Sequence, residues 1–254
     1  MRIITWNCRQ GGLKEKFEKY LAPLKPDVLI VQEADDTDLE GQTNRVWLDP
    51  NGRGHCGLGV YTFNEYSLQK KNTAINSWGL YLPATIHRNG KPAFNVVGFW
   101  TKPKQRGGND YMNGFIKAID KYSAFIRSKP TILAGDLNAL GGLSWYGNIL
   151  TQTEELGLVS AYHEFTKVRI GDEKYEKEST YYHHFKHPMS KGGLPHQLDH
   201  VFIPLTWKRR LSGIRIGTGR MDTARKNGHP ARSDHRPVIV DIDLDIDLSR
   251  GGYF

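Results

Sequence analysis

Short runs of β-branched, aliphatic and aromatic residues recur along the whole chain, and this recurrence most restricts its possible folds. Each run is long enough for a strand, and several alternate between apolar and polar side chains. The runs occupy residues 3–6, 28–31, 59–62, 80–86, 93–101, 131–134, 200–203, 213–216 and 237–242. A chain with this pattern must bury its strands in sheets that pack against each other or under helices.

Two segments have the periodicity of amphipathic helices, namely residues 13–24 and 112–126. They are too few to alternate with the strands as in a doubly wound parallel sheet. The pattern therefore favours an α+β fold with two mixed β-sheets packed as a sandwich and flanked by helices. Because no repeat, low-complexity tract or Pro/Gly/Ser linker divides the 254 residues, we expect one domain over residues 1–254.

The bulk composition favours a cytoplasmic protein with a polyanionic partner. Cys8 and Cys56 are the two cysteines, which argues against a disulfide framework and suits a reducing compartment. No apolar stretch reaches the length of a membrane span, and no signal-peptide core follows Met1. We therefore expect no transmembrane segment and no signal peptide. Lysine and arginine number 35 against 27 acidic residues, a net charge of +8 that favours nucleic acid without requiring it.

Polar residues stand where five of the apolar runs begin or end. Any one of them alone would be an ordinary turn residue. Together they form a set of amide, carboxylate and imidazole groups: Asn7, Gln32 with Glu33, Asp136 with Asn138, Asp199, and Asp234 with His235. Because these groups are mostly oxygen ligands without a thiolate, they favour Mg²⁺ or Mn²⁺ over zinc. They could also supply the base and the charge stabilisation that phosphoester cleavage requires.

Five short motifs carry a resemblance to a known superfamily. TWNC at 5–8, QE at 32–33, GDLN at 135–138, LDHVF at 198–202 and SDHRP at 233–237 resemble the successive motifs of the endonuclease/exonuclease/phosphatase superfamily. That group contains pancreatic-type DNase, AP endonucleases, sphingomyelinases and inositol polyphosphate phosphatases. The resemblance covers residues 5–237 in the family's order, and it implies a DNase-like four-layer αββα sandwich.

The resemblance also implies roles for individual residues. Asn7 and Glu33 would hold the metal, with Glu33 as the main carboxylate, and Asp234 would join this metal set while positioning His235. His235 would contact the scissile phosphate or transfer a proton. Asp136 would orient or deprotonate the attacking water.

Two further catalytic roles follow from the same motifs. Asn138 would hydrogen-bond the phosphate and keep Asp136 in place. Asp199 would support the metal or the leaving-group side.

The chain departs from the family pattern at Trp100. DNase-like members have a histidine at the end of the corresponding strand, and AP endonucleases have a tyrosine. Because an indole cannot usefully release a proton, protonation of the leaving group would fall to a water on the metal, to Asp199 or to a nearby histidine. We keep Trp100 among the expected substrate-binding residues.

Other substrate-binding candidates point to different branches of the superfamily. Arg9 resembles the DNase-like branch, whereas Thr180 and Tyr181 lie in STYY at 179–182, which resembles an AP-endonuclease motif, so we assign no lesion recognition. Arg232 belongs to a basic run before His235 that favours a grip on phosphates. Lys102, Lys104 and Arg106, like the basic residues 208–210, fit solvated loops as well as phosphate contacts.

Two further features have a simpler interpretation than a second site. The histidines at 183, 184, 187, 196 and 200 lack a cysteine partner and helical context, so substrate contacts or surface positions are favoured over zinc. Trp145 and Tyr146 could stack on a base, but core packing is favoured.

We predict a Mg²⁺- or Mn²⁺-dependent phosphodiesterase that acts as a monomer on nucleic acid, with DNA favoured over RNA. One alternative is a phosphatase or phosphodiesterase for a small molecule or lipid headgroup. A third is a nucleic-acid-binding protein with a degenerate site, which Trp100 alone motivates.

Overall fold

Two six-stranded sheets dominate the structure, which is a computed structural model. It describes residues 1–49, 52, 56–71, 79–102, 108–138, 143–169, 180, 197–217, 225–226, 229–230 and 233–245, without the side chains of 108–110, 143–146, 225–226 and 229–230. The first sheet has the order β11 (Leu211–Ile216), β14 (Val238–Ile242), β1 (Arg2–Asn7), β2 (Val28–Ala34), β4 (Gly57–Phe63) and β3 (Gln42–Leu48). The second has the order β5 (Tyr66–Lys70), β6 (Gly79–Arg88), β7 (Lys91–Thr101), β8 (Thr131–Asp136), β10 (Asp199–Pro204) and β9 (Leu158–Ser160). A short ribbon pairs β12 (Arg225–Lys226) with β13 (His229–Pro230).

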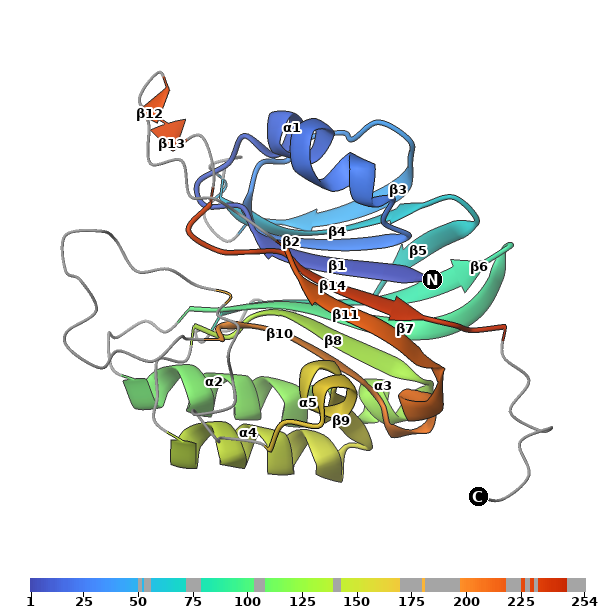
Figure 1. The fold of residues 1–254 in the computed structure, drawn as a ribbon, viewed down its shortest axis with the longest axis vertical. Coiled ribbons are helices and arrows are strands. Elements are labelled where there is room, and N and C mark those ends of the chain that lie inside the picture. The colour runs from blue at the N-terminus through green and yellow to red at the C-terminus, as the bar shows by residue number, and fades with distance from the viewer. Residues whose placement is uncertain are drawn as a thin grey trace.

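Helices cover the outer face of each sheet, which gives four layers (Figure 1). On the first sheet lie α1 (Leu13–Lys16), the π-helix η1 (Phe17–Leu21) and the 3₁₀-helix η2 (Ala22–Leu24). On the second lie α2 (Gly108–Lys121), α3 (Ser123–Ser128) and α4 (Leu143–Glu155). The remaining helical segments are α5 (Ala161–Thr166) and the 3₁₀-helix η3 (Leu205–Arg210).

Three apolar clusters hold these layers together. The central cluster fills the space between the sheets, where Ile30 and Val60 of the first sheet belong to the same core as Leu82 and Val96 of the second. One outer cluster packs Leu13, Phe17 and Leu21 on the first sheet, and the other packs residues such as Phe115, Ile119 and Ile149 on the second. Full burial of one such side chain contributes roughly 1.5–3 kcal/mol, so the sandwich does not depend on a disulfide; both cysteines are free.

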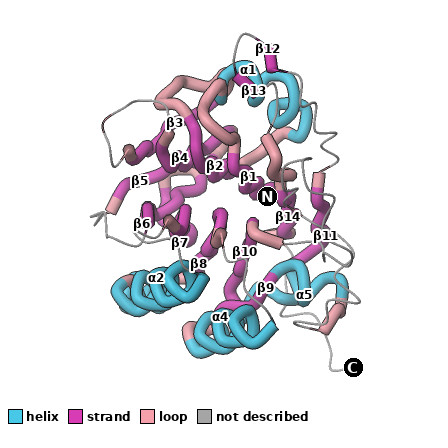
Figure 2. Tube along the Cα trace, turned by 90° about the vertical axis from the view of Figure 1, so that its left-hand side faces the viewer, coloured by secondary structure: helices cyan, strands magenta, loops and turns pink. Residues whose placement is uncertain are grey.

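The strand directions bring the polar strand ends to one end of the sandwich. β1 runs parallel to β2, and β7 runs parallel to β8, with Asn7 opposite Gln32 and Trp100 opposite Asp136. β10 is antiparallel to β8, which places Asp199 opposite Asp136 at its own beginning. The carboxyl ends of β1, β2, β7 and β8 therefore meet the beginnings of β10 and β14 at the end of the sandwich that faces the viewer in Figure 2.

The predicted α+β sandwich of two mixed sheets flanked by helices is confirmed. Each predicted strand coincides with an observed strand to within about one residue, except that several observed strands extend further. The helix predicted at 112–126 is interrupted at Tyr122, and the segment 13–24 contains three kinds of helical turn. Within the described part of the chain, no helix combines the length and apolarity needed to cross a membrane.

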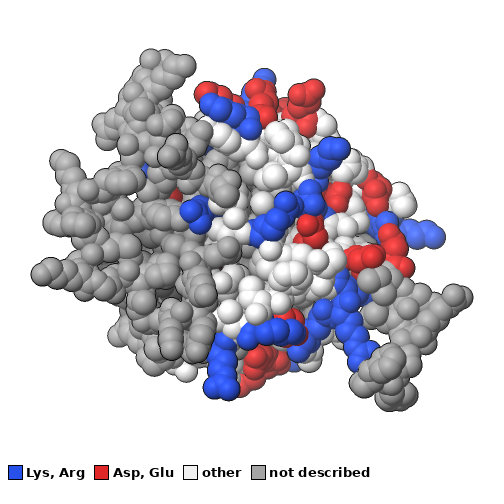
Figure 3. All heavy atoms as spheres, in the orientation of Figure 1, with Lys and Arg blue, Asp and Glu red and all other residues white. Residues whose placement is uncertain are grey.

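Basic and acidic side chains are interspersed on the face shown in Figure 3. Ion pairs also join charged side chains of the described residues, such as Arg2 with Asp241 at 2.6 Å and Arg88 with Asp245 at 2.6 Å. Surface pairs of this kind contribute little to stability. On the coloured part of this face, the basic side chains therefore do not form a separate stripe.

Candidate active site

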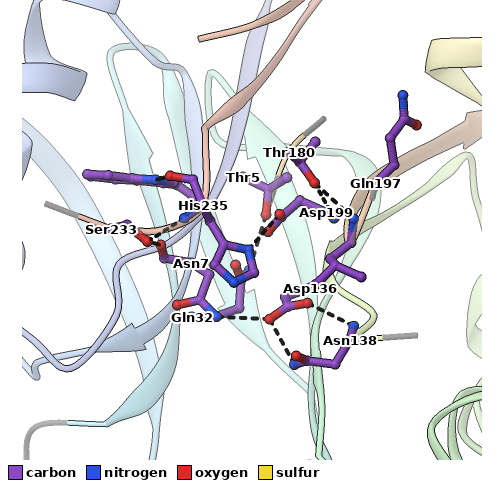
Figure 4. Close-up of polar contacts among 12 residues, drawn as sticks. Thr5, Asn7, Gln32, Asp136, Asn138, Thr180, Gln197, Asp199, Ser233 and His235 are labelled. Atoms are coloured by element: carbon purple, nitrogen blue, oxygen red, sulfur yellow. Dashed lines mark hydrogen bonds and ion pairs between the residues drawn. The ribbon is translucent and has the colours of Figure 1, made fainter. Parts of the chain in front are cut away.

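Asn7 connects the two sheets at the polar end of the sandwich (Figure 4). It is buried at the end of β1, and its Nδ2 donates to Asp136 Oδ2 at 2.8 Å and to Glu33 Oε1 at 3.2 Å. Glu33 lies within a register shift between β2 and β4, which falls between Val31 and Ala34, and it has a φ of 51°. A β-bulge of this kind redirects a side chain away from the regular ladder. The half-buried Glu33 carboxylate consequently lies beside Asn7.

Asp136 is completely buried at the end of β8. In addition to Asn7, it accepts hydrogen bonds from Asn138, whose backbone N lies 2.8 Å from Oδ1 and whose Nδ2 lies 2.8 Å from Oδ2. Burial raises the pKa of Asp136 to about 7, although the positive charge of His235 and the hydrogen bonds from the two asparagines act in the opposite direction. A carboxylate in this condition is a base matched to neutral pH.

His235 and Asp199 form a buried ion pair beside Asp136, with His235 Nδ1 2.7 Å from Asp199 Oδ2. Burial lowers the pKa of His235, but the Asp199 and Asp136 carboxylates outweigh it and raise the pKa to about 10. The imidazole is therefore positively charged at neutral pH, with one ring N–H directed at Asp199.

The backbone around His235 is held from both sides. Trp6 Nε1 donates to the His235 carbonyl at 2.9 Å, and the His235 backbone N donates to Ser233 Oγ at 3.0 Å. Ser233 in turn donates to the Asn7 carbonyl. Sequence reasoning missed Trp6 and Ser233 as site residues, although both lie inside the motifs TWNC and SDHRP.

Thr180 is buried behind Asp199. Its Oγ1 accepts hydrogen bonds from the backbone N of Leu198 at 2.9 Å and of Asp199 at 3.1 Å, and its carbonyl accepts one from Arg236 N at 2.7 Å. These contacts give Thr180 a role in positioning Asp199, and the predicted substrate contact stays a prediction.

Arg9 and Asp234 face each other at the rim, with Arg9 Nη1 3.4 Å from Asp234 Oδ2. Arg9 belongs to a turn in which residues 9–12 all have positive φ. The buried Lys16 ammonium stabilises this turn by donating to the carbonyls of Cys8, Arg9 and Gly11. Lys16 is a further residue that sequence reasoning missed, because no local pattern reports which backbone carbonyls a lysine side chain contacts.

Trp100 lies in the core between the sheets and is only 3% exposed, with Lys102 Nζ 4.6 Å from its ring centroid. The structure thus brings together Asn7, Glu33, Asp136, Asn138 and Asp199 with His235, and places the Arg9–Asp234 pair and Trp100 around them. Other predicted positions lie outside the described residues: Tyr181 and Arg232, the histidines at 183, 184, 187 and 196, Lys104, Arg106, and the side chains of Trp145 and Tyr146.

The donor set fits a divalent cation. One ligand atom each from Asp136, Asp199 and His235 lies within 4.8 Å of the others. Asp199 Oδ1 is buried and has no hydrogen-bond partner among the described residues, which leaves it able to bind a cation. A protonated imidazole cannot be a ligand, so the carboxylates, with Glu33 nearby, are the better donors for a hard cation.

Comparison with known proteins agrees with this geometry. Residues 4–235 match the model of the Endonuclease/Exonuclease/phosphatase family. A search of curated proteins found no matching sequence.

Solved structures share the fold at low sequence identity. An AP endonuclease from Archaeoglobus fulgidus is 14% identical with a TM-score of 0.62, over 96% of this chain and 100% of that one. The endonuclease domain of TRAS1, a telomere-specific non-LTR retrotransposon, is 15% identical with a TM-score of 0.64, over 96% and 99%. The 3′ phosphatase NExo from Neisseria, bound to product DNA hairpin, is 16% identical with a TM-score of 0.61, over 96% and 99%. At these identities the likeness supports the fold.

Proposed function

The chain belongs to the endonuclease/exonuclease/phosphatase family, and from this premise we propose that it is a divalent-metal-dependent phosphodiesterase that cuts nucleic acid, with DNA favoured over RNA. The observation that carries the proposal is the buried Asp136 carboxylate, fixed by three hydrogen bonds beside the Asp199–His235 pair. Such a group can act as a base next to a positive charge, which is the combination that hydrolysis of a phosphodiester requires.

Asp136 is proposed to hold the attacking water and to accept its proton. A carboxylate has about four lone-pair sites, and the described residues donate to three of them. The remaining site on Oδ1 can accept a hydrogen bond from water. The pKa of about 7 makes this oxygen far more basic than an exposed aspartate.

His235 is proposed to bind a non-bridging oxygen of the scissile phosphate. Its positive charge stabilises the negative charge that grows on the phosphoryl group in the transition state. Asp199 keeps the imidazole protonated and oriented through the 2.7 Å contact with Nδ1. Asn138 fixes Asp136 and, as the family motif implies, would also contact the phosphate.

Mg²⁺ or Mn²⁺ would be held by Glu33 with Asn7 and Asp199, whose Oδ1 has no partner among the described residues, and Asp234 would join if its pairing with Arg9 opened. When bound, the cation supplies positive charge to the phosphoryl oxygens. The chain's own residues then bind and orient the substrate and move the proton from water.

Support for a nucleic-acid substrate comes from the charge of +8 and from relatives of the same fold, since NExo was solved with a DNA hairpin. Arg9 at the rim is proposed to contact a phosphate of the strand. Tyr181 and Arg232 remain proposed substrate contacts on the grounds of sequence.

The test is cleavage of supercoiled plasmid and of labelled single-stranded, double-stranded and abasic-site oligonucleotides with Mg²⁺, Mn²⁺ or EDTA. We expect metal-dependent cutting by the wild type, and a loss of about 10²-fold or more in kcat for Asp136→Ala, because a positioned base contributes about that much. Asp120→Ala, which removes an exposed carboxylate on α2, should cut like the wild type. Hydrolysis of a small phosphoester without cutting of any nucleic acid would overturn the substrate assignment.

A further inference from the structure

Lys102 directly follows β7, the strand that carries Trp100. Trp100 and Asp136 are register partners on the parallel strands β7 and β8, and both point into the space between the sheets. Lys102 is the first residue after β7, and Asn138 is the second residue after β8. Asn138 Nδ2 donates to the Thr101 carbonyl at 3.1 Å, which ties the two strand ends together. Lys102 therefore leaves the sheet beside Asn138.

The ammonium of Lys102 is held against the indole of Trp100. Nζ lies 4.6 Å from the ring centroid, within the distance at which a cation is attracted to an aromatic face. Trp100 is 3% exposed and cannot move easily, whereas Lys102 is exposed. The buried ring thus serves as a platform that keeps a solvent-accessible cation at the end of β7.

Lys102 has a positive charge that no described carboxylate neutralises. None of the ion pairs among the described residues includes it. By contrast, Arg9 is paired with Asp234, and His235 is paired with Asp199. Lys102 is therefore a cation at the end of β7, next to the strand that ends in Asp136, and it remains available to a substrate oxygen.

We propose that Lys102 is a catalytic residue that stabilises the leaving oxygen, held in place by Trp100; this rests on the proposed phosphodiesterase function. Water oxygen forms a bond to phosphorus while the bond from phosphorus to the leaving oxygen breaks, and that oxygen keeps the electron pair. The water proton goes to Asp136. The ammonium of Lys102 donates a hydrogen bond and then its proton to the leaving oxygen, and it regains a proton from solvent.

The test compares two leaving groups in Lys102→Met. A sugar oxygen in an oligonucleotide is a poor leaving group, whereas the p-nitrophenolate of bis(p-nitrophenyl) phosphate leaves without protonation. We expect kcat to fall by about 10²-fold for the oligonucleotide, the size of a general-acid contribution, and by less than about 3-fold for the aryl ester. Lys91→Met, at the exposed opposite end of β7, should match the wild type on both substrates.

Two further variants test the platform. Lys102→Arg keeps a cation that can stack on the indole, and it should recover part of the oligonucleotide activity. Trp100→Leu, verified as folded by circular dichroism, should lose activity selectively on the oligonucleotide. The double variant with Trp100→Leu and Lys102→Met should be only slightly less active on the oligonucleotide than Lys102→Met alone.

Three other results would each contradict the inference. Equal losses on both substrates would make Lys102 a binding residue for phosphate only, and unchanged activity would remove it from the site. If the wild type cleaves neither substrate with Mg²⁺ or Mn²⁺, the proposed function fails and the inference fails with it.

Discussion

At the scale of single residues, the site depends on two buried ionisable side chains, the carboxylate of Asp136 and the imidazole of His235. Asp136 is costly to ionise because it is buried, and His235 is easy to protonate because two carboxylates face it. Asp199 controls the protonation of His235, because it contacts the imidazole directly. Its other oxygen has no hydrogen-bond partner among the described residues. The protonation of the site is therefore linked to the stability of the fold.

This linkage predicts how the metal-free protein responds to pH. The pKa of His235 is raised from 6.5 to about 10, so its stabilising charge is fully present below pH 6.5 and is lost as the pH rises through about 10. We expect the free energy of unfolding by urea in EDTA to fall by a few kcal/mol over this interval. In Asp199→Asn, the fall should be smaller and should occur at lower pH, because the main group that raises the pKa is gone.

Asp120→Asn is the matched control, because it removes an exposed carboxylate from α2 and should leave the pH profile unchanged. His235→Gln should remove most of the fall between pH 6.5 and about 8, below the range in which thiols and phenols titrate in the unfolded chain. An Asp199→Asn profile with the wild-type slope and midpoint would contradict the assigned coupling.

At the scale of secondary-structure elements, the site is assembled where β7 and β8 approach each other closely. Gly135 has a φ of 155°, and a Cβ added there would lie 1.8 Å from the Phe99 carbonyl oxygen. The residue after it is Asp136, so the close approach of the two strands sets the position of the catalytic carboxylate. A side chain at 135 would have to separate the strands or rotate the peptide.

We therefore expect Gly135→Ala to destabilise the fold by roughly 3 kcal/mol or more, because strain and a lost ladder contact act together. Gly147→Ala in α4 is the contrasting change, since an added Cβ there meets no atom within 4 Å. It should stabilise the helix by up to about 1 kcal/mol. Urea unfolding of both variants checks this, and equal stabilities would refute the strain argument.

At the scale of the whole molecule, the site lies at one end of the sandwich, and the rest of the surface is outside it. The two sheets bury their shared core between them, and the polar strand ends project from it together (Figure 2). The face seen in Figure 3 mixes both signs of charge. We therefore look to the end of the sandwich that carries the site for the contacts with a long polyanion.

A nuclease that uses several phosphate contacts at this end should respond strongly to salt. We expect kcat/KM on an oligonucleotide to fall by about 10-fold or more between roughly 50 and 200 mM salt, because cations are released from the nucleic acid on binding. Hydrolysis of bis(p-nitrophenyl) phosphate should change by less than about 3-fold, since it engages one phosphate. A flat profile for the oligonucleotide would favour a small-molecule substrate instead.

Much of the fold could be predicted because strands leave a local signal. The apolar runs located most of the strands, and they missed β3, β5 and β9, which are half-buried or short and therefore lack a strong apolar face. The helix α4 was not predicted, because Gly147 and several polar residues obscure its periodicity. Polar residues at strand ends pointed to Asn7, Asp136, Asp199 and His235, but no local pattern reports a pairing such as Arg9 with Asp234.

By itself, the sequence determined the number and kind of layers, the order of the family motifs and the chemical types available to the site. Those properties depend on neighbouring residues and on the short periods of strand and helix. Only the tertiary structure decided that β14 inserts between β11 and β1, that Lys16 caps the turn at 9–12, and that Lys102 rests on Trp100. Such contacts join residues on different elements, and close packing of the sheets and helices selects among the many pairings that the same local patterns allow.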